Sequence, residues 1–213
     1  MTEPTTEELL TDCTVYKFLK GREATHAPRF RYRLGAWKPA IEGELVVCRN
    51  AYHGLRPLDL SQWIARDLFV IESRDEWRED GNKLYTRGPV RIIEHLKGWN
   101  ERAARLAAAD FAEAVLPIFE KVRPGDERPR RAIQAARDYA NGEIGAAARA
   151  AAEAAAWDAA GAAAWDAAGA AAKAAAWAAA KDAAKAAAWA AAWAAAWAAQ
   201  GQIILDYAYG RRS

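Results

Sequence analysis

Residues 186–205 read AAAWAAAWAAAWAAQGQIIL and end an alanine-rich tract that runs from residue 146 to residue 199. Alanine is the strongest helix former, and tryptophan is among the largest apolar side chains. The tract therefore predicts helices that pack their indole rings against the rest of the chain or against a partner. Its tryptophans, separated by multiples of four residues, are Trp157, Trp165, Trp177, Trp189, Trp193 and Trp197.

The phase of these tryptophans argues against one straight helix with a single buried face. Successive residues of an α-helix are ~100° apart around its axis. Trp157 and Trp165 therefore share one stripe of the helix surface, and the three tryptophans from Trp189 onward share another. Trp177 lies on neither stripe. We therefore expect two helices folded back near residues 169–173, with Gly161 as the alternative break. On a second interpretation, the AAAW and AAAK units arise by replication slippage, and the length of the array has no function beyond filling a bundle.

Two further helices are expected ahead of the tract. Residues 100–122 carry apolar residues at spacings of three and four, with Asn100 as N-cap and Pro117 as a kink or interruption. Asp126 can cap a second helix over residues 127–140, which Asn141 and Gly142 close in a left-handed turn. Residues 98–213 thus predict an antiparallel four-helix bundle. The last residues, 203–210, are amphipathic and are expected to seal the final helix.

Residues 13–97 predict a small β-rich domain, preceded by a flexible N-terminus over residues 1–12. Short β-branched and aromatic runs alternate with turn signals there, and residues 57–65 have the pattern of a short helix. The fold class is therefore α+β. The expected strands cover residues 14–19, 29–34, 44–48, 67–72 and 90–96.

Composition limits the function classes. The net charge is +2 and the charges are balanced along the chain, which argues against a general nucleic-acid binder. Residues 186–205 carry no charge, but alanine is nearly neutral in transfer, so a packed helix is favoured over a membrane span. Two cysteines and the absence of a signal-peptide pattern favour a reducing cytoplasm. No cofactor is implied, and the oligomeric state stays open.

The motif CRNAYHG, residues 48–54, brings a thiol and an imidazole together. A catalytic Cys48–His53 pair lacks an orienting third group, and the cysteines and histidines follow no zinc-ligand spacing. A structural turn is therefore favoured, and no metal site is expected. The alternative is a nucleotide-binding or enzymatic module centred on Arg49, Tyr52 and His53.

A cluster of arginines begins the second predicted helix. Arg128, Arg130 and Arg131 are expected to pair with acidic residues across the helical hairpin, namely Glu113, Glu120 or Asp138. The alternative is a partner-binding patch. In that case these arginines would act as anchors together with Trp157, Trp165, Trp189, Trp193 and Trp197, because arginine and tryptophan dominate binding hot spots.

The segment from Trp99 to Ile144 resembles a helical family of immunity proteins associated with bacterial polymorphic toxins. The resemblance implies a helical bundle that ends in alanine-rich helices, and a role in binding another protein. It rests on a VLP-F stretch and a DxRPR-AI-AAR helix, at Val115, Leu116, Pro117, Phe119, Asp126, Arg128, Pro129, Arg130, Ala132 and Ile133.

The preceding region resembles a small domain of unknown function found in bacteriophage and bacterial genomes. Cys48 and His53 match its pattern, whereas Ala51 stands where glycine is common and a second cysteine after the histidine is missing. These departures argue against shared metal or thiol chemistry.

These observations favour a non-catalytic protein of phage or mobile-element type that neutralises a toxin or a host defence component by occlusion. A structural virion or assembly component is a further alternative.

Overall fold

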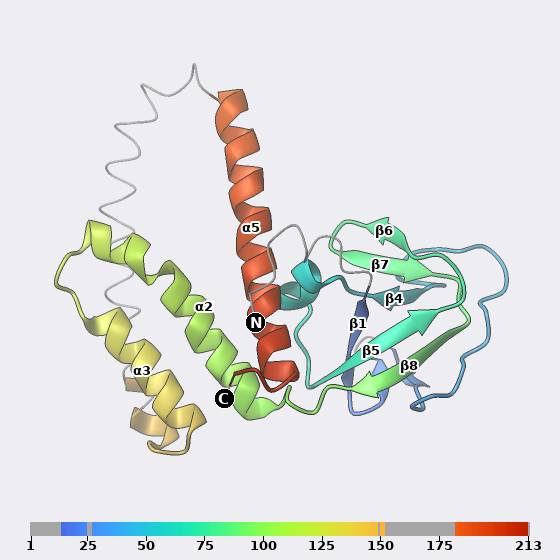
Figure 1. Ribbon diagram of the computed structural model, residues 1–213, viewed down its shortest axis with the longest axis horizontal. Coiled ribbons are helices and arrows are strands. Elements are labelled where there is room, and N and C mark those ends of the chain that lie inside the picture. The colour runs from blue at the N-terminus through green and yellow to red at the C-terminus, as the bar shows by residue number, and fades with distance from the viewer. Residues whose placement is uncertain (1–13, 25–26, 149, 152–181, 213) are drawn as a thin grey trace. The chain divides into compact units, whose positions relative to one another are not determined.

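The computed structural model describes residues 14–24, 27–148, 150–151 and 182–212 (Figure 1). The chain divides into two compact units. One consists of Met1–Ala103 and Trp193–Ser213, and the other of Ala104–Ala192. The chain therefore leaves the first unit near residue 103 and returns to it near residue 193. The predicted domain boundaries at residues 12 and 97 stay predictions.

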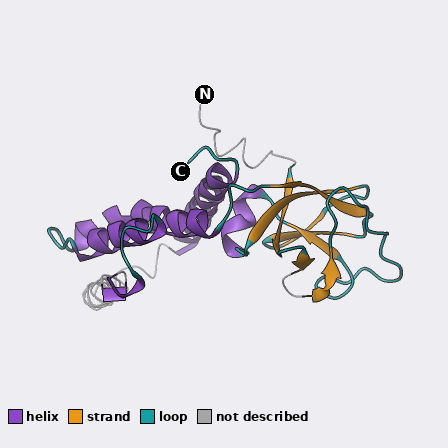
Figure 2. Cartoon of the chain, turned by 90° about the horizontal axis from the view of Figure 1, so that it is seen from below, coloured by secondary structure: helices purple, strands orange, loops and turns teal. Residues whose placement is uncertain are grey.

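Two antiparallel sheets form the β-rich part of the first unit (Figure 2). The larger has the order β3-β2-β1-β5-β8, with β1 Val15–Lys20, β2 Glu23–Ala24, β3 Ala27–Arg31, β5 Asp67–Ser73 and β8 Val90–His95. The smaller has the order β4-β7-β6, with β4 Tyr52–Gly54, β6 Arg78–Asp80 and β7 Lys83–Thr86. Tyr16 and Leu55 exchange backbone hydrogen bonds of 2.9 and 2.8 Å, which join β1 to the end of β4.

The core of this unit lies where the apolar faces of the strands meet. Val15 pairs with Ile71 in the register of β1 and β5, and Ile71 pairs with Ile92 of β8. Alternating residues of each strand point to one face, so these positions are buried together. The cluster consists of Val15, Leu19, Tyr32, Tyr52, Phe69, Ile71, Leu84, Val90 and Ile92.

The longest predicted strands are confirmed as β1, β5 and β8, and residues 29–34 overlap β3. The strand predicted over residues 44–48 is wrong. Asn50 donates its side-chain amide to the carbonyls of Glu42 and Glu44, at 3.0 and 2.8 Å, and Cys48 has a φ of 64°. These contacts hold the segment as a tight loop despite its β-branched residues. The predicted short helix is the 3-10 helix η1, Pro57–Gln62.

Helix α5, Asp182–Ala208, completes the first unit with its last turns. Ile204, Leu205 and Tyr207 are buried, so the amphipathic end of the chain forms the last turns of α5 itself and packs its apolar side chains inward. Gly201 allows this approach, because a Cβ atom there would lie 2.0 Å from the Pro57 carbonyl oxygen of η1. Gly98 plays the same part at the end of α5, where its Cβ would meet the Tyr207 carbonyl oxygen at 2.3 Å.

The second unit contains a helical hairpin of α2, Glu101–Val122, and α3, Arg128–Ala140. Ala109 and Leu116 of α2 pack with Ile133 of α3. Arg137 of α3 donates to Asp110 Oδ1 at 2.7 Å and to Glu113 Oε2 at 2.6 Å. The hairpin is therefore held by a small apolar seam with an ion-pair network beside it.

The predicted Asn100 cap is confirmed, because Asn100 Oδ1 accepts a hydrogen bond from the amide of Ala103 at 3.0 Å. The predicted Asp126 cap is off by one residue: Glu127 is the N-cap of α3 and makes no side-chain cap bond, whereas Asp126 Oδ1, one residue earlier, accepts the amide of Arg128 at 3.1 Å. Gly142 has a φ of 78°, and its amide donates to the Tyr139 carbonyl, which gives the left-handed end of α3.

The predicted interruption at Pro117 does not occur, because α2 continues to Val122. Proline removes the hydrogen bond to the carbonyl four residues earlier, here that of Glu113. Both residues are exposed, so water can hydrate that carbonyl.

The four-helix bundle stays a prediction. Three long helices are described, and the segment with the predicted fold-back near residues 161 and 169–173 lies outside the described residues. Among the helices of the described residues, none is long and apolar enough to cross a membrane.

Candidate functional site

A cavity of about 460 Å³ lies in the β-rich part of the first unit, and we refer to it as the β-domain cavity. Strands of both sheets, the loop before β4 and the residue after η1 provide its walls. Its polar lining includes Lys17, Cys48, Arg49, His53 and Lys83. Its apolar lining includes Phe18, Phe30, Tyr32, Ile41, Tyr52, Leu55 and Trp63.

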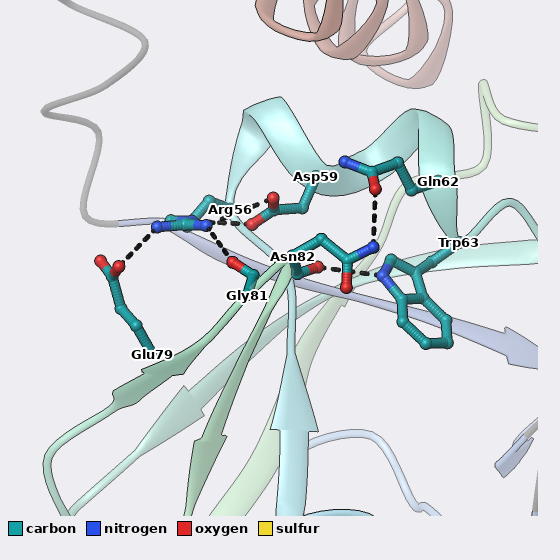
Figure 3. A network of polar contacts seen from close by, with 7 residues as sticks. All are labelled: Arg56, Asp59, Gln62, Trp63, Glu79, Gly81 and Asn82. Carbon is teal, nitrogen blue, oxygen red and sulfur yellow. Dashed lines mark hydrogen bonds and ion pairs between the residues drawn. The ribbon is translucent and has the colours of Figure 1, made fainter. Parts of the chain in front are cut away.

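A network of hydrogen bonds fixes the wall formed by Trp63 (Figure 3). The Trp63 indole N–H donates to the Asn82 carbonyl at 2.9 Å, and the Asn82 side chain donates to Gln62 Oε1 at 2.6 Å. Arg56 donates to the buried Asp59 at 2.7 Å and to the Gly81 carbonyl at 3.0 Å. These bonds tie η1 to the turn between β6 and β7, and they therefore hold Trp63 beside Lys83, the first residue of β7.

Cys48 and His53 meet at the edge of the cavity. The backbone N–H of Cys48 donates to His53 Nε2 at 3.2 Å, so the remaining ring nitrogen, Nδ1, carries the hydrogen of a neutral imidazole. Lys83 Nζ donates to Cys48 Sγ at 3.0 Å, and it also pairs with Asp80 at 3.3 Å. The left-handed backbone of Cys48 makes this geometry possible, and such a conformation is uncommon for a residue with a side chain.

Two of the polar groups in the lining have strongly shifted pKa values. Burial lowers the pKa of Lys17 to about 8. Burial also lowers the pKa of His53 to about 4, and the positive charges of Lys17 and Lys83 add to the effect. His53 is therefore neutral at pH 7, whereas Lys17 is still mostly protonated. Desolvation disfavours the charged form of both bases.

The structure brings Arg49, Tyr52 and His53 to one cavity. The Tyr52 hydroxyl donates to the Pro39 carbonyl at 2.9 Å, which leaves its ring to form the wall. Sequence reasoning missed Lys17, Trp63 and Lys83, because they come from β1, the end of η1 and β7. In the part of the chain that the structure describes, no group of three or more His, Cys, Asp or Glu residues could hold a metal ion.

The three arginines of the predicted patch lie on the first turn of α3. Arg128 pairs with Asp126 at 2.6 Å, and Arg130 pairs with Glu120 of α2 at 2.5 Å, as the sequence predicted for that carboxylate. Arg131 is exposed. Glu113 pairs with Arg137 instead, and Asp138 accepts a hydrogen bond from Gln134. The guanidinium groups of Arg128 and Arg130 are thus oriented by carboxylates and still partly exposed, at 42% and 59%.

The tryptophans of the alanine-rich tract are described only in part. Trp157 and Trp165, like Trp177, lie outside the described residues. Trp189 and Trp193 belong to α5, and Trp197 is a half-buried residue of the same helix. Their predicted role as anchors for a partner stays a prediction.

The helical half of the chain defines the class of protein. Residues 95–202 match the family described as "Imm-5 like putative immunity protein", and this segment covers half of the chain. The chain belongs to this Imm-5-like family. The match includes α2, α3 and most of α5, whereas the β-domain cavity lies before it. No curated protein and no solved structure matches the chain significantly.

Membership of this family suggests a protein-binding role without catalysis. It confirms the resemblance that the sequence of residues 99–144 indicated.

Proposed function

We propose that this chain binds a toxin and neutralises it by occluding its active surface. The observation that carries the proposal is the family match over residues 95–202. A host defence component is the alternative target, and the phage or mobile-element setting inferred from the sequence belongs to the same proposal. An immunity protein needs only to cover its target, so the mechanism requires a complementary surface and no reacting group.

The first turn of α3 is the surface that we propose for this contact. Arg130 and Arg131 are exposed there, and the Glu120 carboxylate orients the Arg130 guanidinium. A side chain that is already held in place loses less conformational entropy when a partner binds. The surface is positively charged and arginine-rich, so an acidic surface on the toxin would complement it and speed association.

The test is co-expression with the protein encoded next to this gene, followed by measurement of growth and of the affinity of the purified complex. Rescue of growth together with a stable complex supports the proposal. A neighbour that is toxic alone and remains toxic beside this chain would overturn it.

Charge reversal then tests the surface. Arg130→Glu combined with Arg131→Glu should weaken binding at least about tenfold. Arg22→Glu is the matched control, because Arg22 is an exposed arginine of the β-rich part. Equal affinity of both variants would remove the α3 surface from the proposal but would leave neutralisation intact.

A further inference from the structure

We propose that the β-domain cavity binds a small organic anion that carries a planar ring. This inference goes beyond the neutralising function, because the cavity is built from residues that precede the family segment. A volume of about 460 Å³ lies within the range of small-molecule sites and can hold one or two rings with an acidic group.

The lining of the cavity is positively charged. Lys17, Arg49 and Lys83 line the cavity, and no described lining residue is a carboxylate. Lys83 has Asp80 as an ion-pair partner. Lys17 is half-buried, donates its one described hydrogen bond to the His53 carbonyl at 2.7 Å and lies 5.4 Å from the centroid of the Tyr32 ring. Among the described residues, no carboxylate pairs with it.

A half-buried ammonium without a counter-ion is costly, because burial removes water that the protein does not replace with a charge. The lowered pKa of Lys17 reflects this cost. A bound carboxylate or phosphate would supply the missing negative charge. It would also accept a hydrogen bond from the Lys17 ammonium, which has three N–H donors and a single described protein acceptor. The same three cations disfavour a positively charged ligand.

Aromatic side chains form one wall of the cavity. Phe30, Tyr32, Tyr52 and Trp63 all line the cavity. Phe30 meets the Tyr52 ring edge to face, at 5.7 Å between centroids, and is itself 41% exposed. Lys38 Nζ lies over the Phe30 ring, 5.1 Å from its centroid, and the rest of the exposed ring is apolar surface against which a planar ligand ring can pack. Trp63 is fixed by its bond to Asn82, so this part of the wall is formed before a ligand arrives.

The His53 imidazole in the lining is neutral. His53 accepts the Cys48 amide at Nε2, so its remaining ring nitrogen is a hydrogen-bond donor without charge. A neutral donor beside cations suits the oxygen atoms of an acid group. Charge, aromatic faces and a polar donor together therefore define the ligand class.

The experiment measures binding to the full chain by titration calorimetry with four probes. AMP and indole-3-carboxylate combine a ring with an acid, adenosine is a ring without charge, and inorganic phosphate is a charge without a ring. We expect AMP or indole-3-carboxylate to bind at least about tenfold more tightly than the last two. The stronger of the first two distinguishes a phosphate ligand from a carboxylate ligand.

Lys17→Met removes the charge and keeps the length of the side chain, and it should weaken binding of the ring-bearing acid at least about tenfold. Lys20→Met is the matched control, because Lys20 lies on the same strand, is exposed and does not line the cavity. Should Lys17→Met fail to fold, Arg49→Ala tests the role of positive charge in the lining through a second cation. Arg49 is exposed and its guanidinium has no described contact, so its replacement should not affect folding.

The rate of Cys48 alkylation tests whether the ligand lies in the β-domain cavity, because Cys48 is part of its lining. In a Cys13→Ser background, the bound acid should slow alkylation of Cys48 by a maleimide at least about tenfold under saturation. Three results would overturn the proposal: no ring-bearing acid binding more tightly than about 1 mM, adenosine or phosphate alone binding as well as the acid, or unchanged binding to Lys17→Met and Arg49→Ala. Toxin neutralisation is measured separately, and its loss would leave this binding test unaffected.

Discussion

Replacement of Gly201 by alanine should destabilise the protein, although alanine is the better helix former. Gly201 lies inside α5, where glycine ordinarily costs ~0.5–1 kcal/mol relative to alanine. Helix propensity alone therefore predicts that Gly201→Ala stabilises. The packing of α5 on η1 predicts the opposite sign.

The magnitude follows from the position of the missing Cβ atom. It would lie 2.0 Å from the Pro57 carbonyl oxygen and 2.7 Å from its carbon, whereas real Cβ atoms essentially never come within 3.0 Å of such atoms. Both neighbours are backbone, so the helix must move by about 1 Å, and overpacking of this kind costs roughly 1–3 kcal/mol. After the gain in propensity of ~0.5–1 kcal/mol, we expect a net loss of up to about 2.5 kcal/mol.

The assay is thermal unfolding followed by far-UV circular dichroism, with urea unfolding as the second measurement. A chain of this length should lose roughly 2–4 °C in Tm for each kcal/mol. Gly201→Leu should lose more, since a larger group must enter the same space. Gly145→Ala is the matched control, because nothing lies within 4 Å of its Cβ position, and it should stay within about 0.5 kcal/mol of the native chain. A Gly201→Ala protein at least as stable as the native one would refute the packing of α5 against η1.

Three further outcomes follow from contacts described above. Arg137→Ala should lower the free energy of unfolding in urea by about 1–2 kcal/mol, because the Arg137 side chain is only 25% exposed and bridges Asp110 and Glu113. Arg131→Ala, at an exposed position of the same helix, should change it little, and equal losses in both variants would contradict the ion-pair network. Asn100→Ala should lower the free energy of unfolding by ~1 kcal/mol, because the α2 cap is lost, whereas Asn100→Asp should keep most of the stability that the cap provides. An Asn100→Ala protein as stable as the native chain would argue against the cap. The folded pKa of His53, about 4, lies below its ordinary 6.5, so the unfolded chain binds more protons between these values. Stability should therefore fall as the pH drops from 6.5 toward 4, and His53→Gln should flatten this dependence in urea unfolding at stepped pH; an unchanged slope would count against the buried neutral imidazole.

The helices and their ends could be predicted from the sequence because their signals are local. Asn100 caps α2, which begins at the next residue, and Asp126 accepts the first amide of α3 from the position before its N-cap. Gly142 supplies the left-handed residue within two residues of the end of α3. Local signals failed where a side chain competed with the backbone. Residues 44–48 have a β-branched run, but the Asn50 amide binds two carbonyls of the same segment and stabilises a loop.

The cavity could be predicted only in part. Arg49, Tyr52 and His53 are close in sequence, so a single motif indicated them. The charges that give the cavity its character are distant along the chain: Lys17 contacts His53 across 36 positions, and Lys83 contacts Cys48 across 35. Only strand pairing brings such residues together, and a single sequence does not specify which strands pair.

The return of the chain to its first unit at residue 193 has a consequence for biosynthesis and for variation of the gene. The last turns of α5 leave the ribosome after α2 and α3, so η1 acquires its packing partner in α5 only after both helices of the hairpin have been synthesised. The alanine-rich units lie mostly between two anchored points of one folded body. Gain or loss of whole four-residue units by slippage upstream of α5 keeps the reading frame and leaves the last turns of α5 unchanged, whereas a frameshift within the tract would remove the part of α5 that belongs to the first unit.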